Sequence, residues 1–144
     1  MRPGCVYGGK QSLLADWFAA AEQNQPLQIV GEGRNRWAMI DLRELAEAYA
    51  LIADQHARGV FHGIDDTNAT IEECARATAP KATVENLPLD EARATMGDYA
   101  DALAVDQRIS SAETRAKLGW TPRRTYINSI AEQWQEWRSL TRSE

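Results

Sequence analysis

Histidine and cysteine are scarce in this sequence, which has two residues of each among 144. Cys5 and Cys74 show neither a metal-binding spacing nor a disulfide framework, so two reduced thiols are expected, as in the cytoplasm. His56 and His62 have no ligand-type partner at helical spacing. We expect a solvated His56 and a structural His62, with the lining of a pocket as the alternative for His62. The sequence therefore predicts no metal site.

Long apolar runs and clustered positive charge are also missing. No apolar run could span a bilayer, and the first four residues lack the apolar core of a signal peptide. The net charge is −5, and the basic clusters at Arg34/Arg36 and Arg123-Arg124 are small. We therefore expect neither a membrane nor a nucleic-acid partner, and a cytoplasmic location.

The usual catalytic motifs are absent as well. There is no Gly-x-Ser-x-Gly sequence, and Gly8-Gly9-Lys10 is too short for a phosphate-binding loop. Asp65-Asp66 lacks the spacing of a metal-binding loop, so a polar turn is expected there. Cys5 has no evident base nearby and is expected to be buried and unreactive. The sequence thus predicts no catalytic residue in this chain.

The stretch from Gly31 to Tyr49 is the most informative part of the chain. Gly31 and Gly33 bracket one residue, which predicts a tight turn. The alternation after Trp37 is typical of a strand, and the period then changes to that of a helix beginning at Leu42. Asp41 is positioned as its N-cap. The predicted inward face is Leu42, Leu45, Ala46, Tyr49 and Ile52.

The remaining patterns predict several helices and a few short strands. Strands are expected at 2–7, 27–30, 59–64 and 83–87, and helices after Ser12 and at 70–79, 89–96, 99–105, 110–118 and 126–140. Thr70–Glu73 and Ser110–Glu113 have the spacing of capping boxes, and Gly119 is placed to end a helix. The apolar stripe expected on the last helix is Ile127, Ile130, Ala131, Trp134 and Trp137. Strands this short and widely spaced are typical of additions to a sheet built elsewhere.

Four segments together resemble the NAD-dependent epimerase/dehydratase family, the extended short-chain dehydrogenase/reductases. Arg2-Pro3-Gly4-Cys5-Val6-Tyr7-Gly8 is similar to the segment after the family's active-site helix. The segment 31–49 is similar to its glycine turn and the following strand and helix. The segment 63–73 is similar to its next strand and helix start, and 110–122 to its C-terminal Leu-Gly-Trp-x-Pro signature. The matches occur in the family's order and cover nearly the whole chain.

The resemblance implies an α/β fold, namely the C-terminal lobe of a Rossmann-type enzyme whose Rossmann core is largely missing. The family's glycine-rich cofactor turn and Tyr-x-x-x-Lys pair are not in this sequence, because none of the four tyrosines has lysine four residues later. Residues 1–144 are therefore expected to form a single substrate-binding lobe, inactive alone. NAD or NADP is expected in the complete enzyme and none on this chain.

The resemblance also implies site residues. Pro3, Gly4 and Val6 would lie against the nicotinamide in the complete enzyme. Cys5 falls where sugar-nucleotide epimerases carry a substrate-binding asparagine. Trp37 falls where they carry an arginine that binds the substrate's diphosphate, with Arg36 one residue before it. These departures favour an atypical subgroup of the family and weigh against a nucleotide sugar. The partner expected is a small-molecule substrate, a nucleotide sugar or another carbonyl or hydroxyl compound.

Two hypotheses remain from the sequence. The chain is either the substrate-binding portion of an NAD(P)-dependent oxidoreductase or epimerase/dehydratase, or a standalone non-catalytic binding or assembly module derived from that lobe. In both, uncovered strand edges and apolar faces predict self-association.

Overall fold

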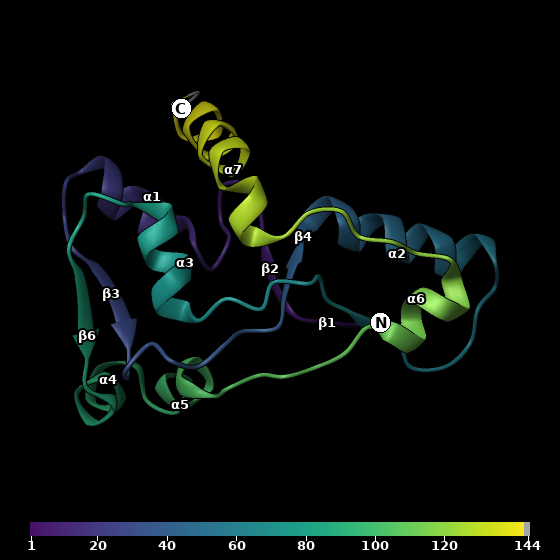
Figure 1. Cartoon of the computed structure of the whole chain (residues 1–144), viewed down its shortest axis with the longest axis horizontal. Coiled ribbons are helices and arrows are strands. Elements are labelled where there is room, and N and C mark those ends of the chain that lie inside the picture. The colour runs from purple at the N-terminus through teal and green to yellow at the C-terminus, as the bar shows by residue number, and fades with distance from the viewer. Residues whose placement is uncertain (143–144) are drawn as a thin grey trace. The chain divides into compact units, whose positions relative to one another are not determined.

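The structure is a computed structural model that describes residues 1–142, in which seven helices and six short strands occur. The chain forms two compact units (Figure 1). Unit 1 comprises Met1–Leu13, Ala38–Thr67 and the chain from Arg108 onward, and unit 2 comprises Leu14–Trp37 and Asn68–Gln107. The described strands pair in three two-stranded parallel sheets. The predicted helix-rich α/β fold with short strands is confirmed.

Unit 1 contains two of these sheets. Strand β1 (Arg2–Pro3) pairs with β5 (His62–Gly63), and β2 (Cys5–Tyr7) pairs with β4 (Met39–Asp41). The N–H groups of Arg2 and Gly4 both donate to β5 or the residue before it, at 2.7 and 3.0 Å. The backbone nitrogen and carbonyl group of Pro3 therefore point away from β5. Because proline has no N–H, that edge of β1 offers an acceptor but no donor at Pro3.

Gly4 divides the strand predicted at 2–7 into β1 and β2. A β-carbon at Gly4 would lie 2.1 Å from the carbonyl oxygen of Ala38 and 2.8 Å from a methyl group of Ile64. Only glycine fits this approach. The packing inside unit 1 is thus a sufficient reason for a glycine in this strand, independent of any cofactor.

Three helices complete unit 1: α2 (Leu42–Asp54), α6 (Ala112–Leu118) and α7 (Tyr126–Thr141). The apolar core of the unit consists of Ile40, Leu45, Ala48, Phe61, Leu118 and Trp120. Gly119 has φ 65°, and α6 ends there as predicted. The buried Nε1 of Trp120 has no hydrogen-bond partner within the described chain. The strand predicted at 59–64 is shorter than expected, since only His62 and Gly63 pair.

The inward faces of α2 and α7 differ from the predicted ones. On α2, Leu45 and Ala48 are buried, whereas Leu42 and Tyr49 are each 49% exposed. On α7 the buried side chains are Tyr126, Ser129, Gln133 and Trp137, while Ile127, predicted to be inward, is exposed. On both helices a buried polar side chain occupies the inward face because it bonds to a distant residue. Glu44 accepts from the N–H groups of residues 123 and 124, and Gln133 donates to Asp41. A capping box at Ser110–Glu113 is also wrong: α6 has no side-chain cap within the described residues, and Glu113 pairs with Lys117.

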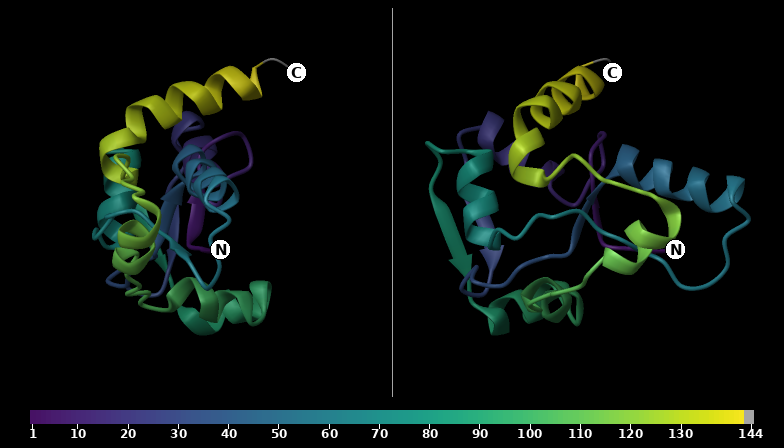
Figure 2. Two further views of the ribbon diagram at one scale, coloured as in Figure 1. Left: turned by 90° about the vertical axis from the view of Figure 1, so that its right-hand side faces the viewer. Right: turned by 45° about the vertical axis from the view of Figure 1, so that its right-hand side comes forward.

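Unit 2 is built around strands β3 (Leu27–Val30) and β6 (Val84–Leu87), which lie side by side in Figure 2. Helices α1 (Ala15–Glu22) and α3 (Ile71–Thr78) pack against them. The capping box at Thr70–Glu73 is confirmed. Ser12 does not cap α1, which begins after Leu14 without a side-chain cap in the described chain.

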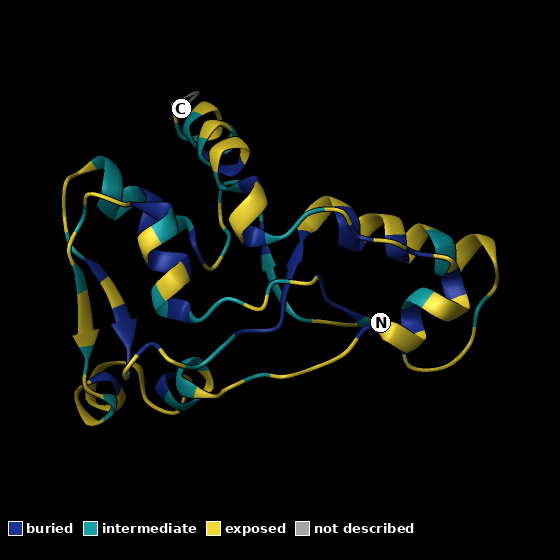
Figure 3. Ribbon diagram, viewed as in Figure 1, coloured by how far each residue is buried: buried dark blue, intermediate teal, exposed yellow. Residues whose placement is uncertain are grey.

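Helices α4 (Leu89–Met96) and α5 (Tyr99–Ala104) form a hairpin next to the end of β3. Val30, Ala92 and Ala100 make the apolar cluster between them, together with partly buried side chains that include Leu87, Leu89 and Leu103. Figure 3 shows β3 mostly buried, whereas the outer sides of α4 and α5 are exposed. Within residues 1–142 no helix has the length and apolar content that crossing a membrane requires.

Candidate functional site

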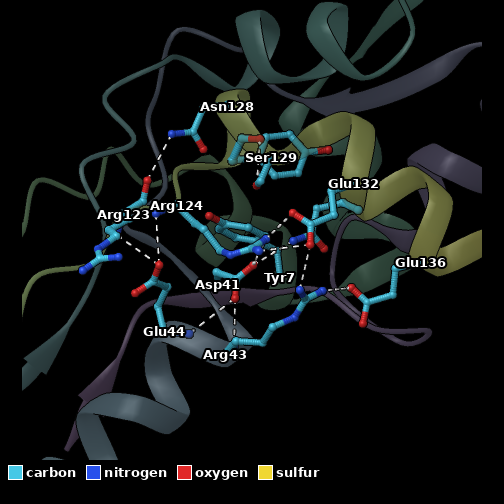
Figure 4. Close-up of polar contacts among 12 residues, drawn as sticks. Tyr7, Asp41, Arg43, Glu44, Arg123, Arg124, Asn128, Ser129, Glu132 and Glu136 are labelled. Carbon is cyan, nitrogen blue, oxygen red and sulfur yellow. Dashed lines mark hydrogen bonds and ion pairs between the residues drawn. The ribbon is translucent and has the colours of Figure 1, made fainter.

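Unit 1 contains a buried polar cluster at the ends of β2 and β4, formed by Tyr7, Asp41, Asp65 and Gln133 (Figure 4 shows its neighbourhood, with Tyr7 and Asp41 labelled). The phenol of Tyr7 donates to Oδ2 of Asp65 at 2.8 Å. Nε2 of Gln133 donates to Oδ2 of Asp41, also at 2.8 Å. These hydrogen bonds connect residues 58 and 92 positions apart in the sequence.

Burial dominates the electrostatics of the Tyr7–Asp65 pair. It raises the pKa of Asp65 to about 6, although hydrogen bonds from Thr67 and Tyr7 to the carboxylate oppose this rise. The pKa of Tyr7 is also raised, first by burial and then by the negative charge of Asp65. A phenol that stays protonated is a hydrogen-bond donor and not a general base at neutral pH. The pair therefore stabilises the turn after β5, where Asp65 also accepts from the N–H of Thr67 at 2.7 Å.

Charged side chains link the start of α2 to α7. Arg43 pairs with Glu132 at 2.8 Å and with Glu136, and Arg124 pairs with Glu132 at 2.6 Å. Hydrogen bonds from Arg124 and Arg43 lower the pKa of Glu132 to about 2. The buried Glu44 accepts from the N–H groups of both Arg123 and Arg124, at 3.0 and 3.1 Å.

Beside this network unit 1 has a polar surface hollow of about 630 Å³, lined by Glu44, Glu47, Arg123, Arg124, Asn128, Ser129 and Glu132. Arg124 pairs with Glu132, while the Glu44 and Asn128 side chains bond backbone groups of Arg123 and Arg124. No group of histidine, cysteine or acidic residues within residues 1–142 is arranged to hold a metal ion.

Unit 2 contains two of the predicted substrate-binding residues, Arg36 and Trp37. The Trp37 ring is 7% exposed and stacks on Trp17 with the ring centroids 6.1 Å apart. Its Nε1 donates to the carbonyl oxygen of Leu103 at 2.9 Å. Nε of Arg36 donates to the carbonyl oxygen of Asn68 at 3.0 Å. Both side chains thus make hydrogen bonds inside unit 2.

The other predicted site residues lie in unit 1. Pro3 is exposed on β1, while Val6 on β2 packs against the apolar core. Cys5 is partly buried, and burial raises the pKa of its thiol, which lowers the reactive thiolate fraction. The roles of Pro3, Gly4 and Val6 toward a nicotinamide, and of Cys5 toward a substrate, stay predictions.

Sequence reasoning did not find Glu44, Asp65 and Gln133 as buried polar residues. Gln133 gives a usable signal in retrospect, because Tyr126, Ser129, Gln133 and Trp137 follow one helical face. Asp65 and Glu44 give no such signal, because their partners are distant in the sequence.

The sequence matches no protein-family model. Two curated relatives, each aligned over 124 residues, are the uncharacterized proteins YLL056C of Saccharomyces cerevisiae, at 28% identity, and C2A9.02 of Schizosaccharomyces pombe, at 25%. Each alignment covers 83% of this chain and 42% of the relative. The chain thus spans less than half the length of the curated relatives it matches.

Solved structures give the fold. The human epimerase family protein SDR39U1 (isoform 2) with NADPH matches 93% of this chain and 47% of its own, with a TM-score of 0.82 and 20% identity. UDP-glucuronic acid 4-epimerase from Bacillus cereus, in complex with UDP-glucuronic acid and NAD, matches 96% and 44%, with a TM-score of 0.70 and 13% identity. dTDP-glucose 4,6-dehydratase from Bacillus anthracis with NAD matches 96% and 43%, with a TM-score of 0.74 and 16% identity.

These likenesses define the class of protein by its fold. The chain has the fold of the C-terminal part of an extended short-chain dehydrogenase/reductase. The resemblance to the NAD-dependent epimerase/dehydratase family found in the sequence is confirmed at the level of this fold.

Proposed function

We propose that this chain is the substrate-binding portion of an NAD(P)-dependent enzyme of the epimerase, dehydratase or reductase type. The supporting observation is the likeness in fold: at least 93% of the chain superposes on less than half of enzymes that contain NAD or NADPH. Fold alone does not define a reaction, so the proposal concerns the enzyme class and the part that this chain supplies.

Two features support the proposal that this chain alone does not bind the dinucleotide. The space left by the missing β-carbon of Gly4 is filled by Ala38 and Ile64 of the same unit, so Gly4 forms no cradle for a ligand. The chain's sequence contains no glycine-rich turn for the pyrophosphate. NAD(P) supplies hydride transfer when bound, and the proposal assigns its phosphates to the rest of the enzyme. Toward the nicotinamide, this chain would contribute the backbone of Pro3, Gly4 and Val6, and not a cavity at the β-carbon position of Gly4.

The test begins with the gene. The coding sequence upstream of Met1 is determined, and the complete reading frame is expressed beside this chain alone. NADH and NADPH are then titrated into both proteins and followed by nucleotide fluorescence. The expected result is an upstream glycine-rich turn and Tyr-x-x-x-Lys pair, saturable binding by the complete protein, and no measurable binding by this chain.

Two results would contradict the proposal. Saturable dinucleotide binding by this chain alone would refute the division of roles. A complete protein that lacks both motifs and binds neither nucleotide would instead support the standalone binding or assembly module.

A further inference from the structure

The negative charge of the chain is concentrated in unit 2. Its two segments contain eleven acidic and five basic residues, a net charge of −6, whereas the rest of the chain has ten acidic and eleven basic residues, a net charge of +1. A surface with a large excess of one sign repels ligands of the same sign. Unit 2 is therefore unfavourable for a ligand that carries several phosphate charges.

The arginines of unit 2 are engaged with acceptors of the same unit. Three of the four form ion pairs with carboxylates, namely Arg34 with Glu32 at 3.4 Å, Arg76 with Glu72 at 2.7 Å, and Arg93 with Asp90 at 2.9 Å and Asp101 at 2.6 Å. Each pair is exposed and weak by itself. Each of these three arginines therefore already has a carboxylate beside its positive charge.

The fourth arginine, Arg36, is positioned by the segment that follows α5. Its backbone N–H donates to the Asp106 carboxylate at 2.9 Å, and its carbonyl oxygen accepts from the N–H of Gln107 at 2.8 Å. Its Nε donates to Asn68, and its positive charge helps to lower the pKa of Glu73. Within unit 2 the guanidinium thus has one hydrogen bond, from Nε to the carbonyl oxygen of Asn68, and its charge acts on the Glu73 carboxylate.

The side chains of Asn35 and Trp37, on either side of Arg36, also bond to the segment that follows α5. The Asn35 amide donates to the carbonyl oxygens of Leu103 and Val105, at 2.9 and 3.2 Å, and the Trp37 indole donates to Leu103 as well. Asn35, Arg36 and Trp37 therefore fasten residues 103–107 of the α4–α5 hairpin. The side chains of Asn35 and Trp37 and the backbone of Arg36 thus hold the end of this hairpin, which itself carries several of the acidic residues.

Unit 2 has a surface hollow of about 500 Å³ whose lining is also poorly suited to a diphosphate. It combines the apolar side chains of Pro88 and Leu89 with the Asn86 amide and the paired side chains of Glu32, Arg34 and Glu72, next to Gly31. Such a lining suits a ligand with apolar surface and hydroxyl or carbonyl groups. Its two carboxylates and one arginine do not favour a diphosphate.

We propose, on the basis of the proposed function, that the substrate of this enzyme is an uncharged carbonyl or hydroxyl compound and not a nucleoside diphosphate sugar. The net charge of unit 2 and the ion pairs of Arg34, Arg76 and Arg93 both disfavour a diphosphate there.

The test compares UDP with uridine, which has the same base and no phosphate. Both are titrated into the ¹⁵N-labelled chain at about 10 mM ionic strength, where charges still interact over about 30 Å and a diphosphate site would bind most tightly. The readouts are the Nε1–H signal of Trp37 and the Nε–H signal of Arg36. In the free spectrum, a Trp37 Nε1–H signal displaced from its random-coil position and slow to exchange with solvent shows that unit 2 is folded.

The expected result is that UDP shifts these signals no more than uridine does, including the case where neither shifts them. A saturable shift by UDP that exceeds the shift by uridine would overturn the proposal. In the complete enzyme, UDP is expected not to compete with turnover. A complete enzyme that binds NADPH and converts a UDP-sugar would refute this inference while leaving the proposed function intact.

Discussion

At the scale of single residues, Asp65 shows how burial changes a carboxyl group. It lies 8% exposed between the Tyr7 phenol and the Thr67 N–H, yet its pKa is raised because burial outweighs both hydrogen bonds. The folded state therefore disfavours the charged form relative to the unfolded chain.

We expect Asp65 to make the protein less stable as the pH rises from about 4 to about 6. The pKa moves from 3.8 to about 6 on folding, so stability present below 3.8 is lost through this window, by ~3 kcal/mol in total. In Asp65→Asn this loss should disappear. Urea unfolding at pH 4 and pH 7 measures it, and an equal pH dependence in both proteins would contradict the raised pKa.

Trp37 in unit 2 and Trp120 in unit 1 are both buried and can be compared with each other. The Nε1 of Trp37 donates to Leu103, whereas that of Trp120 has no partner in the described chain. Phenylalanine keeps an aromatic ring at each site and removes the N–H. We expect Trp37→Phe to cost about 1 kcal/mol more of unfolding free energy than Trp120→Phe, measured by urea denaturation. Equal costs, or a larger cost at Trp120, would show that the hydrogen bond of Trp37 contributes little.

At the scale of elements, local signals predicted the helices better than their faces. Asp41 caps α2 and Thr70 caps α3 as predicted, because each cap is a bond between residues two or three positions apart. Ser110–Glu113 has similar spacing but forms no capping box, since Glu113 pairs with Lys117. The inward faces were misplaced where Glu44 and Gln133 bond to distant partners. The fold was recognised from short motifs, whereas the buried polar contacts depend on tertiary structure.

The two confirmed caps should differ in their contribution to stability. Asp41 is buried and accepts from Arg43, Glu44 and Gln133, whereas the Thr70 cap is exposed. We expect Asp41→Ala to cost about 2–4 kcal/mol, because it also leaves the Gln133 amide unpaired. The control Thr70→Ala should cost about 1 kcal/mol. Thermal or urea unfolding compares them, and similar costs would argue against a structural role for the Asp41–Gln133 bond.

At the scale of the whole molecule, charge is divided between the two units, and apolar side chains remain exposed on α2. Leu42 and Tyr49 are each 49% exposed. We expect the chain to self-associate through such surfaces, with a mass above that of one chain in light scattering. Leu42→Lys with Tyr49→Lys should lower that mass. A wild-type chain that is strictly monomeric at high concentration would contradict this prediction.

Pro3 limits how such assembly can occur. Arg2 and Gly4 direct their N–H groups toward β5, which leaves Pro3 as the residue on the opposite side of β1. Two copies that met side by side along β1 would each bring a carbonyl and no amide hydrogen at this position. Pairing of two copies along β1 is therefore disfavoured by one imino acid.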